Sequence, residues 1–535
     1  MKKMLLAILI AALFVCSIPA MAQDNVLHTY VDRVFRTFSQ VKGSDGHLFI
    51  VLGSISEGLL RLDQDHNPQP ALAESYTVSD DGLVYTFTLR DGIQWSNGVP
   101  ITAKDFEFGW LEAMCDQDAN GYADVIAPFI KNGWAWMNHE VEASEVGVKA
   151  LDDKTFEVTL ENPCAFWDRF ITLPCFFPLN EEFYRAQDGG ELYATSVDTI
   201  WCCGPYVVTY MDLGVGVTLE KNPNYWDADA VKLDGVDIKV ITDSSAALNA
   251  YEAGELDRVN LSSIDVLLYS GSPEFGSYSD FRNYFVQFDV ANPEMNLNIR
   301  KAINFAIDRE TLVNDILMTG AVAAGGVVSR GIHGNDEMSY REYAGDFSYY
   351  DPELAKQYWD AGVAELGYVP EIVMLTAEGT DFDDMATFLQ DCFRKVLGVE
   401  VTINKMTQKA RNEVMKYETY DFALNAWGAD YDDAMTWLEL WINNSNGYRG
   451  NYGTPEYIAM VEDTRSETDP AVRLLSRLRE IQTLKASPMI CILIRMKISG
   501  KSTSINLRNR SKKILLCLFS ATRRIQQEEP LHERN

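Results

Sequence analysis

The chain has 535 residues, of which 47% are hydrophobic, so it is too long for one core and predicts two or three globular domains. Its formal net charge of -32 argues against nucleic acid or an anionic membrane as a partner, because both would be repelled. The carboxylates are spread along the chain, which indicates a solvated acidic surface.

The N-terminus predicts an export signal. A Lys pair, an apolar run of about a dozen residues and the small-residue triplet Ala20-Met21-Ala22 follow one another. The run is too short to span a bilayer, and we expect cleavage after Ala22. A lipid anchor on Cys16 is the less favoured alternative, since Val15 before it is bulky. Either way the mature protein is expected in the periplasm or at the outer face of the cell membrane.

Of the nine cysteines, Cys16 lies in the signal and Cys491 and Cys517 lie in the unusual C-terminal tail described below. The exported body between them holds six, an even number in a compartment that permits disulfides. Their pairing cannot be read from the sequence, and their spacing does not match a metal site. The vicinal pair Cys202 and Cys203 is interpreted as structural, or as partners of Cys164 and Cys175, rather than as redox-active. The six are Cys115, Cys164, Cys175, Cys202, Cys203 and Cys392.

A regular module occupies residues 79–110. Residues 84–89 alternate Val or Thr with Tyr, Phe and Leu, which predicts a half-buried strand. Asp-Gly and Asn-Gly pairs follow, as in hairpin turns, and Pro100 or Thr102 is placed to begin a helix. The helix would carry three large apolar side chains at helical spacing: Phe106, Trp110 and Met114.

A second hairpin is predicted over residues 204–227, with its turn at Asp212 to Gly216. A strand over residues 236–242 and a helix over residues 244–257 come next, a βα unit typical of parallel sheets. The helix is expected to share one face among Ala247, Leu248 and Tyr251.

The second half begins with an amphipathic helix over residues 296–317, followed by a βαβαβ series over residues 371–431. The apolar helix positions are Ile299, Ala302, Ile303, Ala306 and Ile307. The simplest assembly is two α/β lobes joined by crossovers, with an inserted hairpin-rich domain.

Motifs for catalysis or metal binding do not emerge from the sequence. No His pair stands at i, i+4 on a predicted helix, and no phosphate loop or nucleophile elbow occurs. "DQDHN" at Asp63 lacks the Gly and closing Glu of a calcium loop and is interpreted as a turn. We therefore expect no cofactor, no metal and no enzyme activity.

Several blocks resemble the family-5 solute-binding proteins, the extracellular receptors of peptide and nickel ABC importers. They are "ALAESYTVSDDGLVYTFTLRDGIQWSNGVPITAKDF", "GPYVV…LEKNPNYWD", "IKVITDSSAALNAYEAGELD" and "IRKAINFAIDRETLVNDIL", within residues 56–484. The resemblance implies an α/β fold, a two-lobed periplasmic-binding-protein clamshell of type II, in the large three-domain subclass, with mixed sheets and an inserted α+β domain. Ligand would be enclosed by hinge closure, without chemistry.

The resemblance also suggests domain boundaries. We expect a signal peptide over 1–22, lobe I over 23–65 plus 204–285, the inserted hairpin-rich domain II over 66–203, and lobe III over 286–485. The module at 79–110 would build the inserted domain, which enlarges the cleft for a ligand of peptide size.

The block "NAWGADYDDAMTWL" is similar to the Trp-x-x-Asp-Tyr segment of the oligopeptide-binding branch. The resemblance implies that Asp430 receives the α-ammonium of a peptide and that Trp427, beside Tyr431, walls a side-chain pocket. A buried ammonium needs a carboxylate partner, which would reject ligands without a free amine. Tyr122 matches a tyrosine that contacts the peptide backbone, and Glu57 is a weaker candidate.

Other interpretations stay open. Trp427 and Tyr431 could be core aromatics at a strand end, and Asp430 could be an N-cap. The ligand could be a nickel chelate, haem or an oligosaccharide, and an exported hydrolase is a further alternative. The expected partners are a short peptide and the transmembrane subunits of an ABC permease, with the receptor a monomer. Water-filled side-chain pockets would leave the peptide sequence undetermined.

The composition changes abruptly at the C-terminus. From Lys485 onward the chain holds eleven Lys and Arg against three Glu, whereas acids dominate elsewhere. The family would here return to the first lobe through a strand. We interpret residues 486–535 as an anomalous basic tail that arose from a shift of reading frame near residue 485. A genuine basic tail that binds an anionic surface is the competing interpretation.

Overall fold

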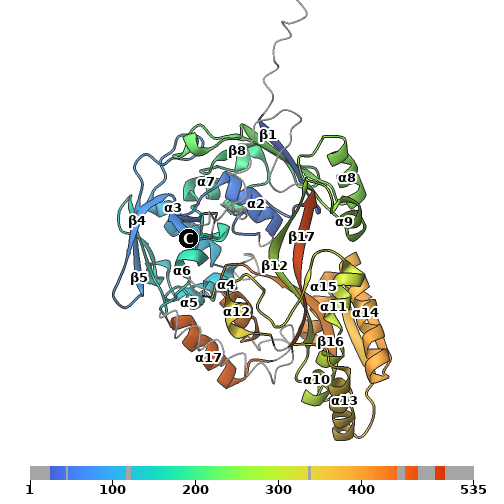
Figure 1. Cartoon of the computed structure of the whole chain (residues 1–535). Helices are drawn as coiled ribbons and strands as arrows, with labels where there is room; N and C mark the ends of the chain where they lie inside the picture. Colours follow the sequence, from blue (N-terminus) through green and yellow to red (C-terminus); the bar gives the residue numbers. More distant parts are fainter. Residues whose placement is uncertain are drawn as a thin grey trace, which may run out of the picture.

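The computed structural model describes residues 25–43, 46–64, 66–115, 122–334, 339–346, 348–442, 452–467 and 489–500. The predicted signal peptide and Cys16 lie outside these residues. The described residues form three large sheets, two of four strands and one of seven, and a small two-stranded sheet. Figure 1 shows the four-stranded sheets in one half of the molecule, and the seven-stranded sheet extends into the other half, with its two longest strands running between them.

The first sheet has the order β1-β10-β9-β8 and is mixed, since β1 and β10 are parallel and the other pairs antiparallel. Its strands are β1 (Val26–Val31), β8 (Tyr206–Asp212), β9 (Gly216–Lys221) and β10 (Gly235–Val240). The predicted hairpin at 204–227 is β8–β9, with the amides of Gly214 and Val215 bonded to Asp212 Oδ1. Two helices accompany the sheet, α2 (Gly46–Ile55) and α8 (Ser244–Glu252). On α8, Ala247 is buried as expected, whereas Leu248 and Tyr251 are only half-buried.

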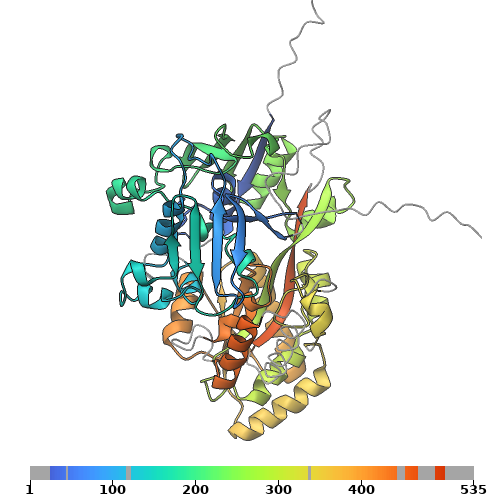
Figure 2. The same ribbon diagram turned by 90° about the vertical axis from the view of Figure 1, so that its left-hand side faces the viewer.

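The second sheet is an antiparallel meander with the order β4-β5-β7-β6. Figure 2 shows its strands side by side. They are β4 (Ala73–Val78), β5 (Val84–Leu89), β6 (Val148–Ala150) and β7 (Thr155–Thr159). On β5 the predicted alternation is confirmed, because Tyr85, Phe87 and Leu89 are buried and their neighbours are not.

Helix α3 (Ala103–Ala113) covers this sheet and begins after Thr102, one of the two predicted start residues. Asp105 Oδ2 accepts the Thr102 amide at 2.7 Å and so closes the first turn. Phe106, Trp110 and Met114 are all buried, as predicted. The ring centres of Trp110 and Phe176 lie 4.7 Å apart, in the edge-to-face geometry that aromatic pairs prefer.

Short elements complete the first half. A two-stranded sheet, β2 (Leu60–Leu62) and β3 (Pro68–Pro70), holds the "DQDHN" segment in its turn, where Asp63 Oδ1 accepts the Asn67 amide at 2.9 Å. This is the turn role expected for Asp63. The short helices are α4 (Ala123–Ile126), α5 (Gly133–Met137), α6 (Trp167–Phe170) and α7 (Glu181–Ala186).

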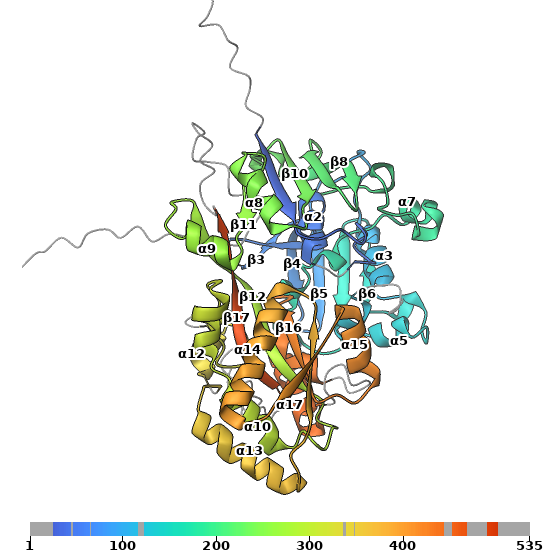
Figure 3. The same cartoon turned by 90° about the vertical axis from the view of Figure 1, so that its right-hand side faces the viewer.

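The third sheet has the order β11-β17-β12-β16-β14-β15, with β13 paired to β17. Strands β14, β15 and β16 are parallel neighbours joined by α14 and α15, which confirms the predicted βαβαβ series (Figure 3). These elements are β14 (Ile372–Ala377), α14 (Thr380–Leu397), β15 (Val401–Met406), α15 (Gln408–Tyr417) and β16 (Phe422–Gly428).

The helix predicted over 296–317 is not continuous. Helix α10 (Leu297–Ala306) ends at Ile307, and α11 (Arg309–Thr311) restarts the chain and leads into a wider π-helical turn over Leu312–Leu317. The break occurs because the Asp308 side chain accepts the Thr311 amide at 3.1 Å, as an N-cap does. The predicted apolar stripe is nevertheless buried at all its positions, where α10 packs on α13 (Pro352–Leu366).

Two long strands, β12 (Phe275–Phe288) and β17 (Met489–Gly500), pair along most of their lengths and run between the two halves of the molecule (Figure 1). The β12–β17 register shifts between Ser279 and Arg282, where Phe281 has φ of 49°. Of the predicted tail, residues 489–500 thus form a strand, and residues 501–535 lie outside the part described. The remaining elements are β11 (Val259–Asn260), α9 (Ser263–Tyr269), β13 (Val322–Ala323), α12 (Tyr340–Ala344), α16 (Met435–Leu438) and α17 (Pro455–Ser466).

Candidate functional site

Two of the predicted site residues meet although they are 308 positions apart in the chain. The Tyr122 hydroxyl donates to Asp430 Oδ1 at 3.0 Å. Tyr122 precedes α4 beside the second sheet, and Asp430 lies in the loop after β16 of the third sheet. The bond therefore joins the two halves of the molecule.

The loop that carries Asp430 is held by its neighbours. The Asp430 amide donates to Thr436 Oγ1 at 3.1 Å, and the Ala429 amide donates to the Phe281 carbonyl at 3.2 Å. The next carboxylates serve the local backbone, since Asp432 accepts the His333 amide and Asp433 accepts the Met435 amide, both at 2.8 Å. This anchoring places the Asp430 carboxylate without an N-cap role of its own, because Ala434 precedes α16.

Burial and charge keep Tyr122 protonated. Only 8% of Tyr122 is exposed, and burial raises the pKa of its phenol, with the nearby Asp430 charge adding to the effect. Burial also raises the pKa of the Cys175 thiol, and Asp430 again contributes. The phenol and the thiol thus remain neutral beside the Asp430 carboxylate. The ring of Phe49 lies 5.4 Å from that of Tyr122.

Tyr431 is more deeply buried than Asp430. Its ring stacks on Phe166 at 4.8 Å and meets Phe170 edge-on at 5.4 Å, so it packs against aromatic residues beside the second sheet. Its hydroxyl donates to Glu439 Oε1. These contacts favour the core interpretation of Tyr431. Trp427 is half-buried on β16 and pairs in register with Asn283 of β12.

Glu439, which accepts the Tyr431 hydroxyl, also forms an ion pair. Arg465 of α17 donates to Glu439 Oε2 at 3.0 Å, with only 16% and 17% of the two side chains exposed. The Arg465 guanidinium also lies 5.1 Å from the centre of the Phe129 ring. Arg465 and Tyr431, both linked to Glu439, therefore contact aromatic residues beside the second sheet, Phe129 and Phe166 respectively.

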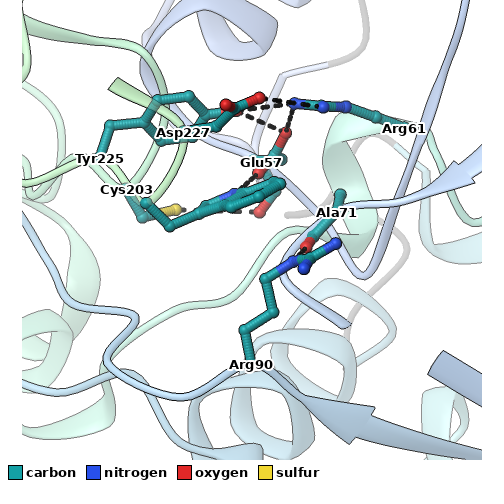
Figure 4. A network of polar contacts seen from close by, with 8 residues as sticks. Glu57, Arg61, Ala71, Arg90, Cys203, Tyr225 and Asp227 are labelled. Atoms are coloured by element: carbon teal, nitrogen blue, oxygen red, sulfur yellow. Dashed lines mark hydrogen bonds and ion pairs between the residues drawn. The ribbon is translucent and has the colours of Figure 1, made fainter. Parts of the chain in front are cut away.

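Glu57 lies apart from Asp430, in a buried polar network (Figure 4). Its Oε1 accepts from Arg61 at 3.1 Å and from the Tyr225 hydroxyl at 2.8 Å, and its Oε2 accepts from the Trp226 indole at 2.6 Å. Arg61 also pairs with Asp227 at 3.2 Å. Burial raises the pKa of Glu57, although Arg61 and the other donors oppose the shift.

A cavity of about 770 Å³ adjoins this network. Arg61, Arg90 and Trp226 line it, and the Arg90 guanidinium lies 4.0 Å from the centre of the indole ring (Figure 4 shows Arg90). Thr172 and Phe177 form another part of the lining. Phe170, just before that segment, packs on Tyr431, so the segment lies between the cavity and the Asp430 loop.

Comparison with known proteins identifies the family. Residues 67–449 match the bacterial extracellular solute-binding proteins, family 5. The dipeptide-binding protein DppE of Bacillus subtilis is 32% identical over 455 residues, covering 84% of this chain and 83% of its own. The oligopeptide-binding protein OppA of the same organism is 30% identical and covers 79% and 78%. The chain belongs to the family-5 solute-binding proteins.

Solved structures agree with this assignment. The substrate-binding domain of an oligopeptide ABC transporter from Bacillus anthracis superposes with a TM-score of 0.77 at 29% identity, over 90% of this chain and 95% of that one. Listeria monocytogenes OppA bound to peptide gives 0.76 at 28% identity, with the same coverage. The fold is the expected α/β two-lobed clamshell with mixed sheets. The domain boundaries within it stay predictions.

Among the described residues of this solute-binding protein, no disulfide joins the cysteines that the sequence left as possible partners. Cys164, Cys175, Cys202 and Cys203 are thiols there, as are Cys115 and Cys392. Each has its own surroundings: Cys203 Sγ lies 3.8 Å from the Glu57 carbonyl, whereas Cys175 is near Asp430. Burial raises the pKa of Cys202 to about 11 and that of Cys203 further, so both are protonated thiols.

Some neighbours of the site escaped the sequence analysis. Phe49, Phe166 and Cys175 contact or surround Tyr122, Asp430 and Tyr431, yet each lies within an ordinary apolar stretch of the sequence. No spacing rule points to them, because only tertiary packing brings them to the site. Within the described residues, no group of three or more His, Cys, Asp or Glu could hold a metal ion, and no helix is long and apolar enough to cross a membrane.

Proposed function

We propose that this solute-binding protein captures short peptides between its lobes and delivers them to an ABC permease. The observation that carries the proposal is the Asp430 carboxylate, held at the contact between the two halves by a hydrogen bond from Tyr122. The names of the relatives support it, since DppE and OppA of B. subtilis are dipeptide- and oligopeptide-binding proteins.

The chemistry follows from where this charge lies. A peptide ammonium placed beside Asp430 pairs with a carboxylate at a partly buried site, where the ion pair is worth more than in water. Tyr122 stays a neutral donor there and can turn its hydroxyl to a peptide carbonyl. Because Tyr122 and Asp430 come from different halves, a ligand that contacts both stabilises the closed arrangement.

The other predicted site residues have different proposed roles. Trp427 is proposed as a wall of the ligand space, and Tyr431 as the aromatic support behind Asp430, given its packing on Phe166. Glu57 already accepts three hydrogen bonds. We therefore propose that Glu57 shapes its cavity and fixes Arg61 rather than binding the peptide amine.

The proposal extends to location and partners. The receptor acts outside the cytoplasm, in the periplasm or at the outer face of the cell membrane, after removal of residues 1–22. A lipid anchor on Cys16 remains the less favoured alternative. Its partners are a short peptide and the transmembrane subunits of the permease, with the receptor a monomer that neither binds nucleic acid nor cleaves its ligand.

The test is calorimetric titration of the chain from Gln23 onward with a pool of tri- to pentapeptides and with the same pool N-acetylated. Binding of the free pool and its loss on acetylation are expected, and mass spectrometry should recover the peptides intact. Equal binding of both pools, or none, would overturn the proposal. A steroid acid is then the next ligand to titrate, because a 26% identical relative is the probable deoxycholate-binding periplasmic protein YgiS of Escherichia coli.

A further inference from the structure

Helix α9 carries an apolar face that the described residues leave open. Ile264, Leu267 and Leu268 are 70%, 61% and 74% exposed. Their i, i+3, i+4 spacing puts the three side chains on one face of the helix. Scattered exposed apolar residues are ordinary, but three large ones grouped on one short helix mark a surface that another segment covers.

The chain leaves the described structure next to this face. Gly500, the last residue of β17, pairs with Val259 of β11 and with Phe275 of β12. Helix α9 lies between these two strands in the sequence, so Gly500 is flanked by both ends of the segment that carries it. Figure 3 shows α9 and β11 at this end of β17. Gly500, the last described residue before the tail, thus lies beside the segment that carries α9.

The following residues have matching chemistry. Residues 501–535 hold eight Lys and Arg against three Glu, whereas residues 250–275 around α9 hold five Asp and Glu against one Arg. The tail also contains the apolar run Ile514–Phe519. Ile514 comes fourteen positions after Gly500, a reach of about 45 Å when extended. The basic residues of the tail can therefore pair with carboxylates near α9, and its apolar run can pack on the apolar face of α9.

We propose that residues 501–535 dock on this region of the same chain, with the run Ile514–Phe519 covering Ile264, Leu267 and Leu268. Basic residues of the tail face the carboxylates near α9, such as Glu252 and Asp265. The role is structural and separate from ligand capture, since α9 is not part of the Asp430 loop or the Glu57 cavity. It holds for the chain as its sequence stands, whatever the reading frame that gave rise to the tail.

Hydrogen exchange in the full chain tests the docking. The double variant Leu515→Asp with Leu518→Asp should make the amides of α9 exchange about tenfold faster, because a carboxylate cannot enter the apolar contact. The matched control is Ile525→Asp with Leu531→Asp, which changes tail residues outside the run and should leave α9 as in the parent chain. Equal α9 exchange in the parent and both variants would overturn the proposal.

A cross-link gives a second test that does not depend on disrupting the tail. Cys517 lies inside the apolar run, so Leu268→Cys should form a disulfide with it in the monomer under mild oxidation. Leu151→Cys, at another exposed leucine, should not. If the Leu268→Cys variant forms this link only between chains, the face belongs to a second copy and the proposal is overturned. Absence of any link in a folded variant would also overturn it.

Discussion

The Tyr122 hydroxyl donates to Asp430 across the contact between the two halves of this solute-binding protein, at 3.0 Å. Neither residue could act alone in the same way. Asp430 supplies a charge whose loop is anchored through Thr436, and Tyr122 supplies a neutral donor from the opposite side. The pair therefore joins the two halves, and it is where we propose that a peptide is recognised.

Asp430→Asn should weaken binding of free-amine peptides by about 100-fold, because the ammonium then loses its charged partner. Acetylated peptides should bind neither the parent nor this variant. Tyr122→Phe should cost about tenfold, as expected for one hydrogen bond to a charged group. Titration calorimetry measures both.

The control is Asp432→Asn in the same loop, where the amide oxygen can still accept from the His333 backbone. It should change peptide affinity by less than about twofold. Equal losses in Asp430→Asn and Asp432→Asn would show that the loop, and not the Asp430 charge, carries recognition.

Glu439→Gln should lower the free energy of unfolding by about 3 kcal/mol, since it leaves Arg465 largely buried without its carboxylate partner and weakens the bond to Tyr431. Urea unfolding measures the change. Glu181→Gln breaks an ion pair with Arg185 at 2.8 Å whose side chains are 57% and 58% exposed. That control should cost less than about 1 kcal/mol. Similar costs for the two variants would contradict the bridging role of Glu439.

Glu57 should make stability fall as pH rises. Burial raises its pKa above the ordinary 4.5, so the folded state holds this proton to higher pH than the unfolded state. The contribution is most favourable below about pH 4.5 and is lost as pH rises through the folded-state value. The free energy of unfolding of the parent, relative to Glu57→Gln, should therefore decrease above pH 4.5, by at most about 1.4 kcal/mol per pH unit.

Asp81 should change the free energy of unfolding with pH in the opposite direction and serves as the comparison. Ser79 and the Leu83 amide lower its pKa, so its contribution is present above the ordinary value of 3.8 and is lost as pH falls. The parent relative to Asp81→Asn should thus gain stability with rising pH in the acid range. Urea unfolding from pH 3 to 7 measures the free energy of unfolding of the parent, Glu57→Gln and Asp81→Asn. A rising curve for the Glu57 pair would contradict the assignment.

Gly204→Ala should destabilise the protein by about 2 kcal/mol, because the added Cβ would lie 2.6 Å from the Ser56 amide nitrogen. That strain falls next to Glu57 and would disturb its network. Gly53→Ala is the control, since its Cβ meets nothing within 4 Å in helix α2, and it should stabilise by about 0.5 kcal/mol. Urea unfolding separates the two, and a neutral Gly204→Ala would show that this backbone contact is not tight.

The sequence predicted the local elements well where periodicity and turn chemistry agree. Strand β5, the β8–β9 hairpin and the βαβαβ series all formed as expected. It failed at residues 296–317, where Asp308 caps a new turn and breaks a helix that periodicity alone would continue. Polar side chains compete locally with helical bonds, and periodicity does not record that competition.

The sequence by itself determined the family and the order of many elements, and it predicted Tyr122 and Asp430 as site residues, through motifs that lie within short stretches. Tertiary structure decided that these two meet, that Tyr431 belongs to an aromatic contact with Phe166, and that Glu57 is enclosed by Arg61, Tyr225 and Trp226. The physical reason is how far apart along the chain the interacting residues lie. Turns, caps and amphipathic faces arise from neighbours a few residues apart, whereas burial and charge pairing depend on segments that only the packed fold brings together.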